Sequence, residues 1–226
     1  MKQIPLAIGA IGAGPEQSFD NFMPGANAAA VVHLQTMLLG TAPVYLWGPA
    51  GSGKTHLLKS LVRQCVAQGQ RSLWFSSRDL TPWELHEGAS LIVFDGCDRF
   101  DEAQQHAAFT LFVEATTHGI AVAAAGRVPP VDLPMREDLR TRLGWGHVFA
   151  LQPLTEPEVR AVLRREADRR GVFLSDEVMD YLLTRFARDL KHLMGLLDGL
   201  DQFALANKRA ITVPLLKQML AEEGGA

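Results

Sequence analysis

The sequence has few cysteines, no long apolar run and no surplus of positive charge. Its two cysteines, Cys65 and Cys97, stand far apart and form no Cys-x-x-Cys pair, which argues against a disulfide framework or a zinc site. No segment reaches the roughly 18 to 20 uninterrupted apolar residues of a membrane span. The first residues also lack the long apolar core of a signal peptide. We therefore expect a cytoplasmic protein with no membrane association.

The charge balance limits the possible partners. The net charge is −3, from 22 basic and 25 acidic residues in a chain of 226. Sequence-independent binding to phosphate backbones needs a surplus of Lys and Arg, so we expect no strong direct binding to nucleic acid. Hydrophobic residues make up 47% of the chain and charged residues 21%, which is typical of a globular protein with one large or two unequal domains.

Over the first 150 residues, short apolar runs alternate with longer segments of helical periodicity. The apolar runs predict buried strands at 44–47, 72–76, 91–94, 120–125 and 148–151. The periodic segments predict helices at about 26–39, 55–69, 102–118 and 136–143, with Asn27 as the start signal of the first. Strands separated by helices are typical of a parallel sheet that is covered on both faces.

Beyond Leu151 only helical periodicity remains. Thr155-Glu-Pro-Glu158 is a Thr-x-x-Glu capping box with proline in the first turn, and it predicts the first of four helices. Near the other end, the Gly-rich stretch at 9–14 predicts a flexible joint. We expect three parts: a flexible peptide and linker at 1–14, an α/β domain at 15–153 and an all-helical domain at 154–226.

The strongest motif is a phosphate-binding loop between the first predicted strand of the sheet and the helix after it. It matches G-x-x-x-x-G-K-[ST] with Gly48, Pro49, Ala50, Gly51, Ser52, Gly53, Lys54 and Thr55. Glycines let successive N–H groups turn toward one anion, and the following helix adds its positive end. Lys54 would reach the β and γ phosphates, and the Thr55 hydroxyl would ligate Mg²⁺. The motif predicts nucleotide binding.

An acid at the end of a buried strand completes such a site. Asp95 follows Leu91-Ile-Val-Phe and would hold the metal through water. The next position, where ATPases of this kind usually place a second acid to activate water, is Gly96, with Asp98 nearby. Because positioning of the attacking water is a major part of phosphoryl transfer, we predict a nucleotide binder with weak or absent ATPase activity of its own.

Three segments resemble the AAA+ superfamily, and within it the DnaA-related branch. The helix start Gly53-Lys-Thr-His-Leu-Leu58, the opening segment Ser18-Phe-Asp-Asn-Phe22 and the segment Arg140-Thr-Arg142-Leu-Gly-Trp145-Gly are each similar to motifs of that branch. The last is similar to its arginine-finger box. The resemblance implies an AAA+ P-loop domain, with a five-stranded parallel sheet between helices, followed by a small helical lid.

Within the branch, the sequence resembles the Hda family of regulators more closely. The leading peptide Gln3, Ile4, Pro5, Leu6, Ala7 and Ile8 is similar to the clamp-binding peptide of that family. Leu151-Gln-Pro-Leu154, Arg188-Asp-Leu-Lys191 and Ile211-Thr-Val-Pro214 are similar to its lid. In this sequence no helix-turn-helix domain follows the lid, unlike in DnaA. The resemblance implies that Gln3 would enter a polar subsite of the sliding clamp, the beta subunit of DNA polymerase III, while Leu6 and Ile8 would fill an apolar groove.

The resemblance also assigns roles at the nucleotide. His56 follows the P-loop motif, and Lys191 stands where the family usually presents an arginine to the nucleotide, so phosphate contact would survive without bidentate geometry. The strand ending at Ala124-Ala125 lacks the polar residue with which many relatives sense the γ-phosphate. With Gly96, these departures predict ADP as the resident nucleotide, although ATP with Mg²⁺ stays open.

Arg142 is the residue that the resemblance makes central, as an arginine finger acting in trans on the ATP of DnaA. The alternative is an ordinary cation near a helix C-terminus, with Arg136 and Arg140 close by. Trp145 is expected to serve packing or an interface. The resulting hypothesis is a negative regulator of replication initiation that is held near the nucleoid by the clamp.

Two other functions remain open from the sequence. One is an ATP-hydrolysing helicase loader or single-stranded-DNA-dependent ATPase, and the other is a nucleotide-gated adaptor without a finger. The oligomeric state also stays open, a homo-oligomer being one possibility.

Overall fold

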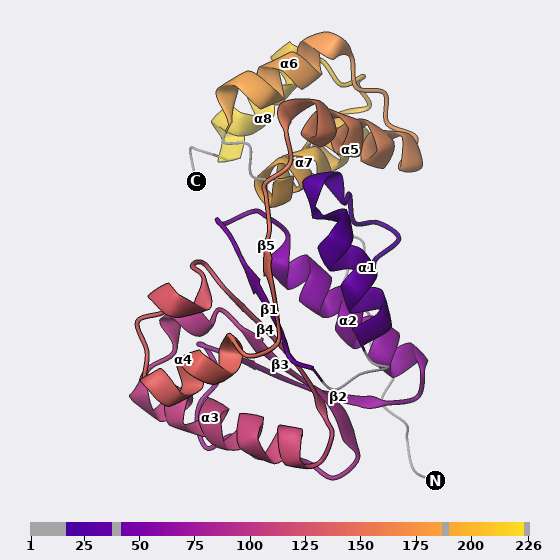
Figure 1. The fold of residues 1–226 in the computed structure, drawn as a ribbon. Helices are drawn as coiled ribbons and strands as arrows, with labels where there is room; N and C mark the ends of the chain where they lie inside the picture. The colour runs from indigo at the N-terminus through magenta and orange to yellow at the C-terminus, as the bar shows by residue number, and fades with distance from the viewer. Residues whose placement is uncertain (1–16, 38–41, 187–189, 224–226) are drawn as a thin grey trace, which may run out of the picture.

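The computed structural model describes residues 17–37, 42–186 and 190–223. It contains a five-stranded parallel sheet in the order β2-β3-β4-β1-β5, with helices on both faces and a helical unit at one end (Figure 1). The strands are β1 (Val44–Trp47), β2 (Arg71–Ser76), β3 (Ala89–Asp95), β4 (Ala121–Gly126) and β5 (His147–Ala150). The predicted fold class is confirmed, with strand ends that differ from the expected ones by at most two residues.

Each face of the sheet has its own helices and its own core. Helices α1 (Ala28–Thr36) and α2 (Lys54–Ala67) cover one face, and α3 (Glu102–Thr117) and α4 (Glu137–Leu143) cover the other (Figure 1). Successive side chains of a strand point to opposite faces. In β3, Leu91 and Val93 therefore pack with α1 and α2, whereas Ile92 and Phe94 pack with α3. Burial on both faces explains the continuous apolar runs of the sequence.

The carboxyl ends of all five strands lie at the same edge of the sheet because the strands are parallel. β1 leads there into the P-loop (residues 48–55), and β3 ends there at Asp95. β5 leaves the same edge and leads into the helical unit (Figure 1). The two predicted halves of the nucleotide site thus meet on the side of the sheet that faces the helical unit.

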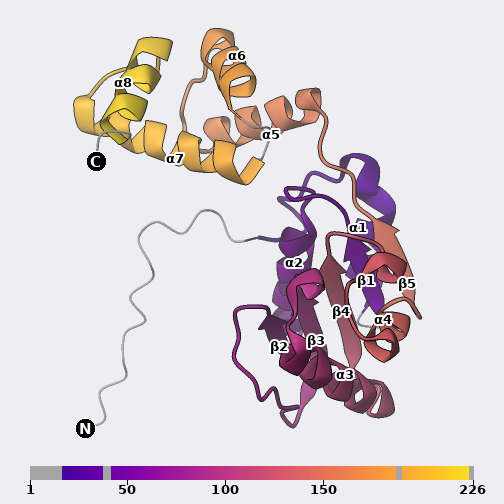
Figure 2. The same ribbon diagram turned by 90° about the vertical axis from the view of Figure 1, so that its left-hand side faces the viewer.

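The helical unit, called the lid from here on, lies beyond one end of the sheet (Figure 2) and has a leucine-rich core of its own. It consists of α5 (Glu156–Arg169), α6 (Asp176–Arg185), α7 (Leu190–Asn207) and α8 (Val213–Glu223). The capping box at Thr155 forms, since the Thr155 amide donates to Glu158 Oε2 at 2.7 Å. No helix within the described ranges is long and apolar enough to cross a membrane.

The sequence predicted Asn27 as the start signal of the first helix. In the structure, the Asn27 side chain does not cap that helix. Its amide nitrogen instead donates to the Gln152 carbonyl at 2.9 Å, and its side-chain oxygen accepts from the Gln152 amide at 2.8 Å. A buried amide satisfies its donor and acceptor best where another backbone offers both. Asn27 therefore fastens the start of α1 to the chain that crosses to the lid, and α1 is shorter than the expected 26–39, running from Ala28 to Thr36.

Candidate functional site

The P-loop has a backbone that only glycine accommodates at its key turns. Gly48, Gly51 and Gly53 have φ angles of +150°, +79° and +94°. A Cβ at Gly48 would overlap the Leu151 carbonyl, and one at Gly53 would lie 2.6 Å from the Phe22 ring. The loop therefore stays tight and leads directly into α2, whose N-terminal N–H groups favour an anion. This is the geometry of a phosphate cradle.

Lys54 lies across the loop to which it belongs. Its Nζ donates to the carbonyls of Gly48 and Pro49, both at 2.7 Å, and to Ser52 Oγ at 3.2 Å. Burial lowers the pKa of Lys54, and the charges of Asp95 and Asp98 oppose that effect. The Lys54 cation is thus held at the P-loop, where the sequence motif predicts that phosphates bind.

Thr55 and Asp95, predicted to hold a metal, lie side by side. Thr55 Oγ1 donates to Asp95 Oδ2 at 2.9 Å. Hydroxyl and carboxylate oxygens are the ligands that Mg²⁺ prefers, and Mg²⁺ keeps several waters beside one or two such groups. The residues present therefore fit a Mg²⁺–nucleotide complex at the mouth of the P-loop, in which the metal would neutralise phosphate charge.

The region after Asp95 departs from an ordinary ATPase site at Gly96 and Asp98. Gly96 has a φ of +75°, and a Cβ there would lie 2.5 Å from Arg99 Nη2, so a second acid at this position would displace that side chain. Asp98 is directed to the end of β4, where it accepts from the Arg127 amide at 3.1 Å and meets Arg127 Nε at 3.8 Å. Asp98 is therefore engaged in holding β4 to the turn after β3.

Arg127 is a charged residue near the P-loop that sequence reasoning missed. Ala124 and Ala125 are fully buried and apolar, as the sequence implied, and the strand ends at Gly126. Arg127 follows directly, and its charge acts on Lys54. The only sequence signal for it was its place as the first charged residue after the predicted strand.

His56 contacts the N-terminal strap (residues 18–22). Its Nε2 lies 3.0 Å from both the Ser18 carbonyl and Asn21 Oδ1, and the Phe22 ring meets it edge-on at 5.2 Å. Burial lowers the pKa of His56, which disfavours the imidazolium. On the other side of the strap, Arg165 of α5 donates to the Asn21 carbonyl at 3.1 Å. The strap thus joins the P-loop helix to the lid, a role for His56 that sequence reasoning did not foresee.

Arg142 lies in the last turn of α4, on the sheet face opposite to α2. Its guanidinium carbon is 5.2 Å from the centre of the Phe109 ring on α3, within cation–π range. Arg136 also lies over this ring, but it is engaged with Asp138 Oδ2 at 2.6 Å and His106 Nδ1 at 3.0 Å. In the described part of the chain, Arg142 forms no ion pair with a carboxylate.

Two sets of predicted site residues lie outside the described parts of the structure. The clamp-binding peptide from Gln3 to Ile8 precedes the described residues. Lys191 lies within α7, but its side chain is not among those described. Their roles stay predictions.

Comparison with known proteins gives one family match and several structural matches. The family "Hda, lid domain" matches residues 156–220. Domain III of the replication initiation protein DnaA from Thermotoga maritima is similar with a TM-score of 0.77 and 20% identity, over 92% of this chain and 97% of that one. AMPPCP-bound DnaA from Aquifex aeolicus has a TM-score of 0.69 and 22% identity, over 82% of this chain and 65% of that one.

A third structural match lies outside the DnaA proteins. The Thermotoga maritima RuvB Holliday junction branch migration motor has a TM-score of 0.69 and 17% identity, over 91% of this chain and 71% of that one. At such identities the likeness establishes the fold, whereas the family match concerns the lid. Residues 156–220 thus match the Hda lid family, and the chain as a whole shares its fold with DnaA domain III and RuvB.

Proposed function

We propose that this protein is a negative regulator of DNA replication initiation. It binds an adenine nucleotide, is tethered to the DNA-loaded sliding clamp, and promotes hydrolysis of the ATP that is bound to DnaA. The Hda-type lid and the DnaA-type fold support a regulatory role of this kind. Its own nucleotide then has a structural purpose, and the hydrolysis that matters takes place on the partner.

The observation that carries the proposal is the location of Arg142. Leu139 and Leu143 pack α4 into the core shared with α3, whereas Leu57 and Leu58 pack α2 into the core on the opposite face. The sheet therefore separates Arg142 from the P-loop of its own chain, which supports action on the nucleotide of another subunit. An arginine finger supplied in trans accelerates phosphoryl transfer by roughly 10³- to 10⁵-fold.

The resident nucleotide is proposed to be ADP with Mg²⁺. The hydrogen bond between Thr55 and Asp95 supports their role as metal ligands, but Gly96 carries no second acid and Asp98 is bound to Arg127. A site of this composition can hold a nucleotide while leaving the attacking water without a base. Nucleotide released from the purified protein and identified by mass should be mostly ADP. Mostly ATP, or no nucleotide at all, would contradict this part of the proposal.

The clamp supplies the coupling to replication. The peptide Gln3–Ile8 is proposed to bind the clamp, with the Gly-rich residues 9–14 as the linker to the AAA+ domain. A tether of this kind raises the effective concentration of one partner near another without any new contact. Because the clamp stays on newly replicated DNA, inactivation of DnaA would follow replication.

The test is hydrolysis of ATP preloaded on DnaA, with this protein, with DNA-loaded clamp, or with both. The proposal predicts fast hydrolysis only when both are present, and loss of the clamp effect when residues 1–8 are deleted. None of the described core residues lies within residues 1–8, so folding should persist. If the ATP on DnaA is unaffected while the protein itself hydrolyses ATP in the presence of single-stranded DNA, the protein is a helicase loader and the proposed regulatory function is wrong.

A further inference from the structure

We infer that Trp145, together with Val131 and Val148, is an apolar anchor that docks the nucleotide-bound partner beside Arg142. This inference rests on the proposed function and deepens it by naming the surface that gives the partner its affinity. The occupant is the rim of the nucleotide site of another P-loop subunit, in the proposed case DnaA carrying ATP.

The three apolar side chains come from segments next to the end of α4: the turn at 130–132, the loop after α4 and β5. Val131 is 76% exposed, Trp145 is 69% exposed and Val148 is 40% exposed. Pro130, next to Val131, would touch a Cβ placed on Gly144 at 3.3 Å, which brings the turn at 130–132 to the end of α4. Val148 pairs in register with Tyr45, whose ring belongs to the core under α3 and α4, so Val148 points to the same face as α4.

The backbone at Trp145 is fixed, although the side chain is exposed. Its amide donates to the Arg142 carbonyl at 3.2 Å, which ties its position to that of the proposed finger. A Cβ on Gly146 would overlap the Pro43 carbonyl, and His147 donates its amide to that same carbonyl at 2.8 Å. The loop is therefore fixed on both sides of an exposed tryptophan. A loop whose backbone is already ordered loses less entropy on binding, and tryptophan is enriched at binding hot spots.

Charge complementarity identifies the occupant. The last turn of α4 carries Arg140 and Arg142, and its acidic residues, Glu137 and Asp138, are in the first turn. An apolar corner flanked by two cations fits a partner surface that presents phosphates beside apolar side chains. An occupied P-loop site presents phosphates, and the finger must approach them to act.

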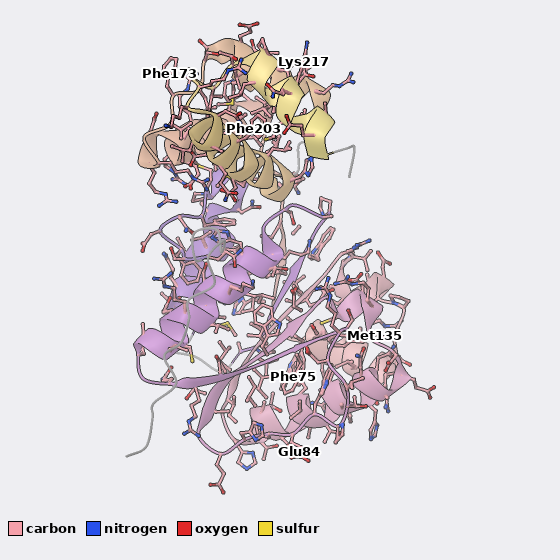
Figure 3. The ribbon with its side chains drawn as sticks, turned by 180° about the vertical axis from the view of Figure 1, so that it is seen from behind. Phe75, Glu84, Met135, Phe173, Phe203 and Lys217 are labelled. Atoms are coloured by element: carbon pink, nitrogen blue, oxygen red, sulfur yellow. The ribbon has the colours of Figure 1, made fainter. Side chains whose placement is uncertain are left out.

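Other strongly exposed apolar side chains serve as matched controls. Leu80 is 92% exposed in the connection from β2 to β3, and Phe173 is 82% exposed in the lid, remote from Met135 and α4 (Figure 3). Single exposed apolar residues are common on protein surfaces and need no partner. Removal of either should leave docking unchanged.

The test separates affinity from chemistry in single-turnover hydrolysis of DnaA-bound ATP, measured with DNA-loaded clamp present and titrated with each variant. Trp145→Ala should raise the half-saturating concentration about 10-fold or more while the maximal rate stays near that of the wild type. Leu80→Ala and Phe173→Ala should titrate like the wild type, and Trp145→Phe should recover much of the affinity. A Trp145→Ala titration that matches the wild type would overturn the inference.

A direct binding measurement separates this inference from the proposed function. Each variant is passed over immobilised DnaA loaded with AMPPCP, so that no hydrolysis is needed. If the wild type binds but fails to accelerate hydrolysis, the proposed function is wrong, and weaker binding of Trp145→Ala alone would still support the anchor. Equal binding of the wild type and Trp145→Ala, or no binding by the wild type, would contradict the anchor.

Discussion

At the scale of single residues, the P-loop depends on the absence of a side chain at Gly53. The Phe22 ring closes over this position, so the glycine serves both the left-handed backbone and a close approach of the strap. These two requirements can be separated because Gly69 has a similar φ of +73° but no atom within 4 Å of its Cβ position. The sequence motif requires a glycine here, whereas only the structure shows what the glycine contacts.

We expect Gly53→Ala to lower the free energy of unfolding by about 2 to 3 kcal/mol, from backbone strain plus displacement of Phe22. Gly69→Ala carries the backbone strain alone and should cost about 1 kcal/mol. Urea unfolding of both variants measures the difference. Equal costs would show that the contact between Phe22 and Gly53 contributes nothing.

Lys54 is the side chain that we propose supplies positive charge to the phosphates. Lys54→Ala should weaken nucleotide binding by roughly 100-fold, since charge-assisted hydrogen bonds to phosphate are among the stronger polar contacts. Lys59→Ala, on the exposed side of the same helix, removes the same charge away from the loop and should change affinity by less than about 3-fold. Titration calorimetry with ADP measures the nucleotide affinity of both variants. Similar losses of affinity in the two variants would indicate a nonspecific effect of charge.

At the scale of elements, specific hydrogen bonds join the start of α1 to the chain that enters the lid. Asn27 is 4% exposed and makes two hydrogen bonds to the Gln152 backbone. Asn27→Ala should therefore destabilise the protein by about 2 kcal/mol, because it leaves buried backbone groups unpaired. Asn207→Ala, which removes one exposed hydrogen bond to the Phe203 carbonyl, should cost less than about 1 kcal/mol in the same unfolding experiment. A larger cost for Asn207→Ala than for Asn27→Ala would show that the hydrogen bonds of Asn27 do not stabilise the fold.

Two histidines connect elements and make stability depend on pH. Burial lowers the pKa of His56 at the strap, and burial with the neighbouring His147 lowers the pKa of His33, whose ring lies 4.1 Å from that of His147. The unfolded chain then binds more protons than the folded one just below pH 6.5, so these groups favour the folded state above that value and lose their contribution as pH falls.

Urea unfolding at pH 7.5 and 5.5 should show lower stability at pH 5.5. His56→Gln combined with His33→Gln should reduce this difference. Stability that rises on acidification, or a pH dependence that the double substitution leaves unchanged, would contradict the assignment of the shifts to these two contacts.

At the scale of the whole molecule, the sequence predicted the sheet because its central strands β1, β3 and β4 are buried on both faces and therefore read as continuous apolar runs. The P-loop and Asp95 were predictable because parallel strands bring their carboxyl ends to one edge. The partners of His56, the engagement of Asp98 with Arg127 and the Phe109 platform under Arg142 were not predictable. Each depends on a side-chain direction between segments far apart in sequence, which periodicity does not encode.

The central claim is that Arg142 acts on the nucleotide of DnaA, and one comparison tests it most directly. Single-turnover hydrolysis of labelled ATP on DnaA is measured at saturating concentrations of wild type, Arg142→Ala and Arg136→Ala, each with DNA-loaded clamp. The account predicts that Arg142→Ala loses at least about 100-fold in maximal rate. Arg136→Ala should keep most of the rate, because that side chain is engaged with Asp138 and His106. Full activity of a folded Arg142→Ala variant would contradict the account.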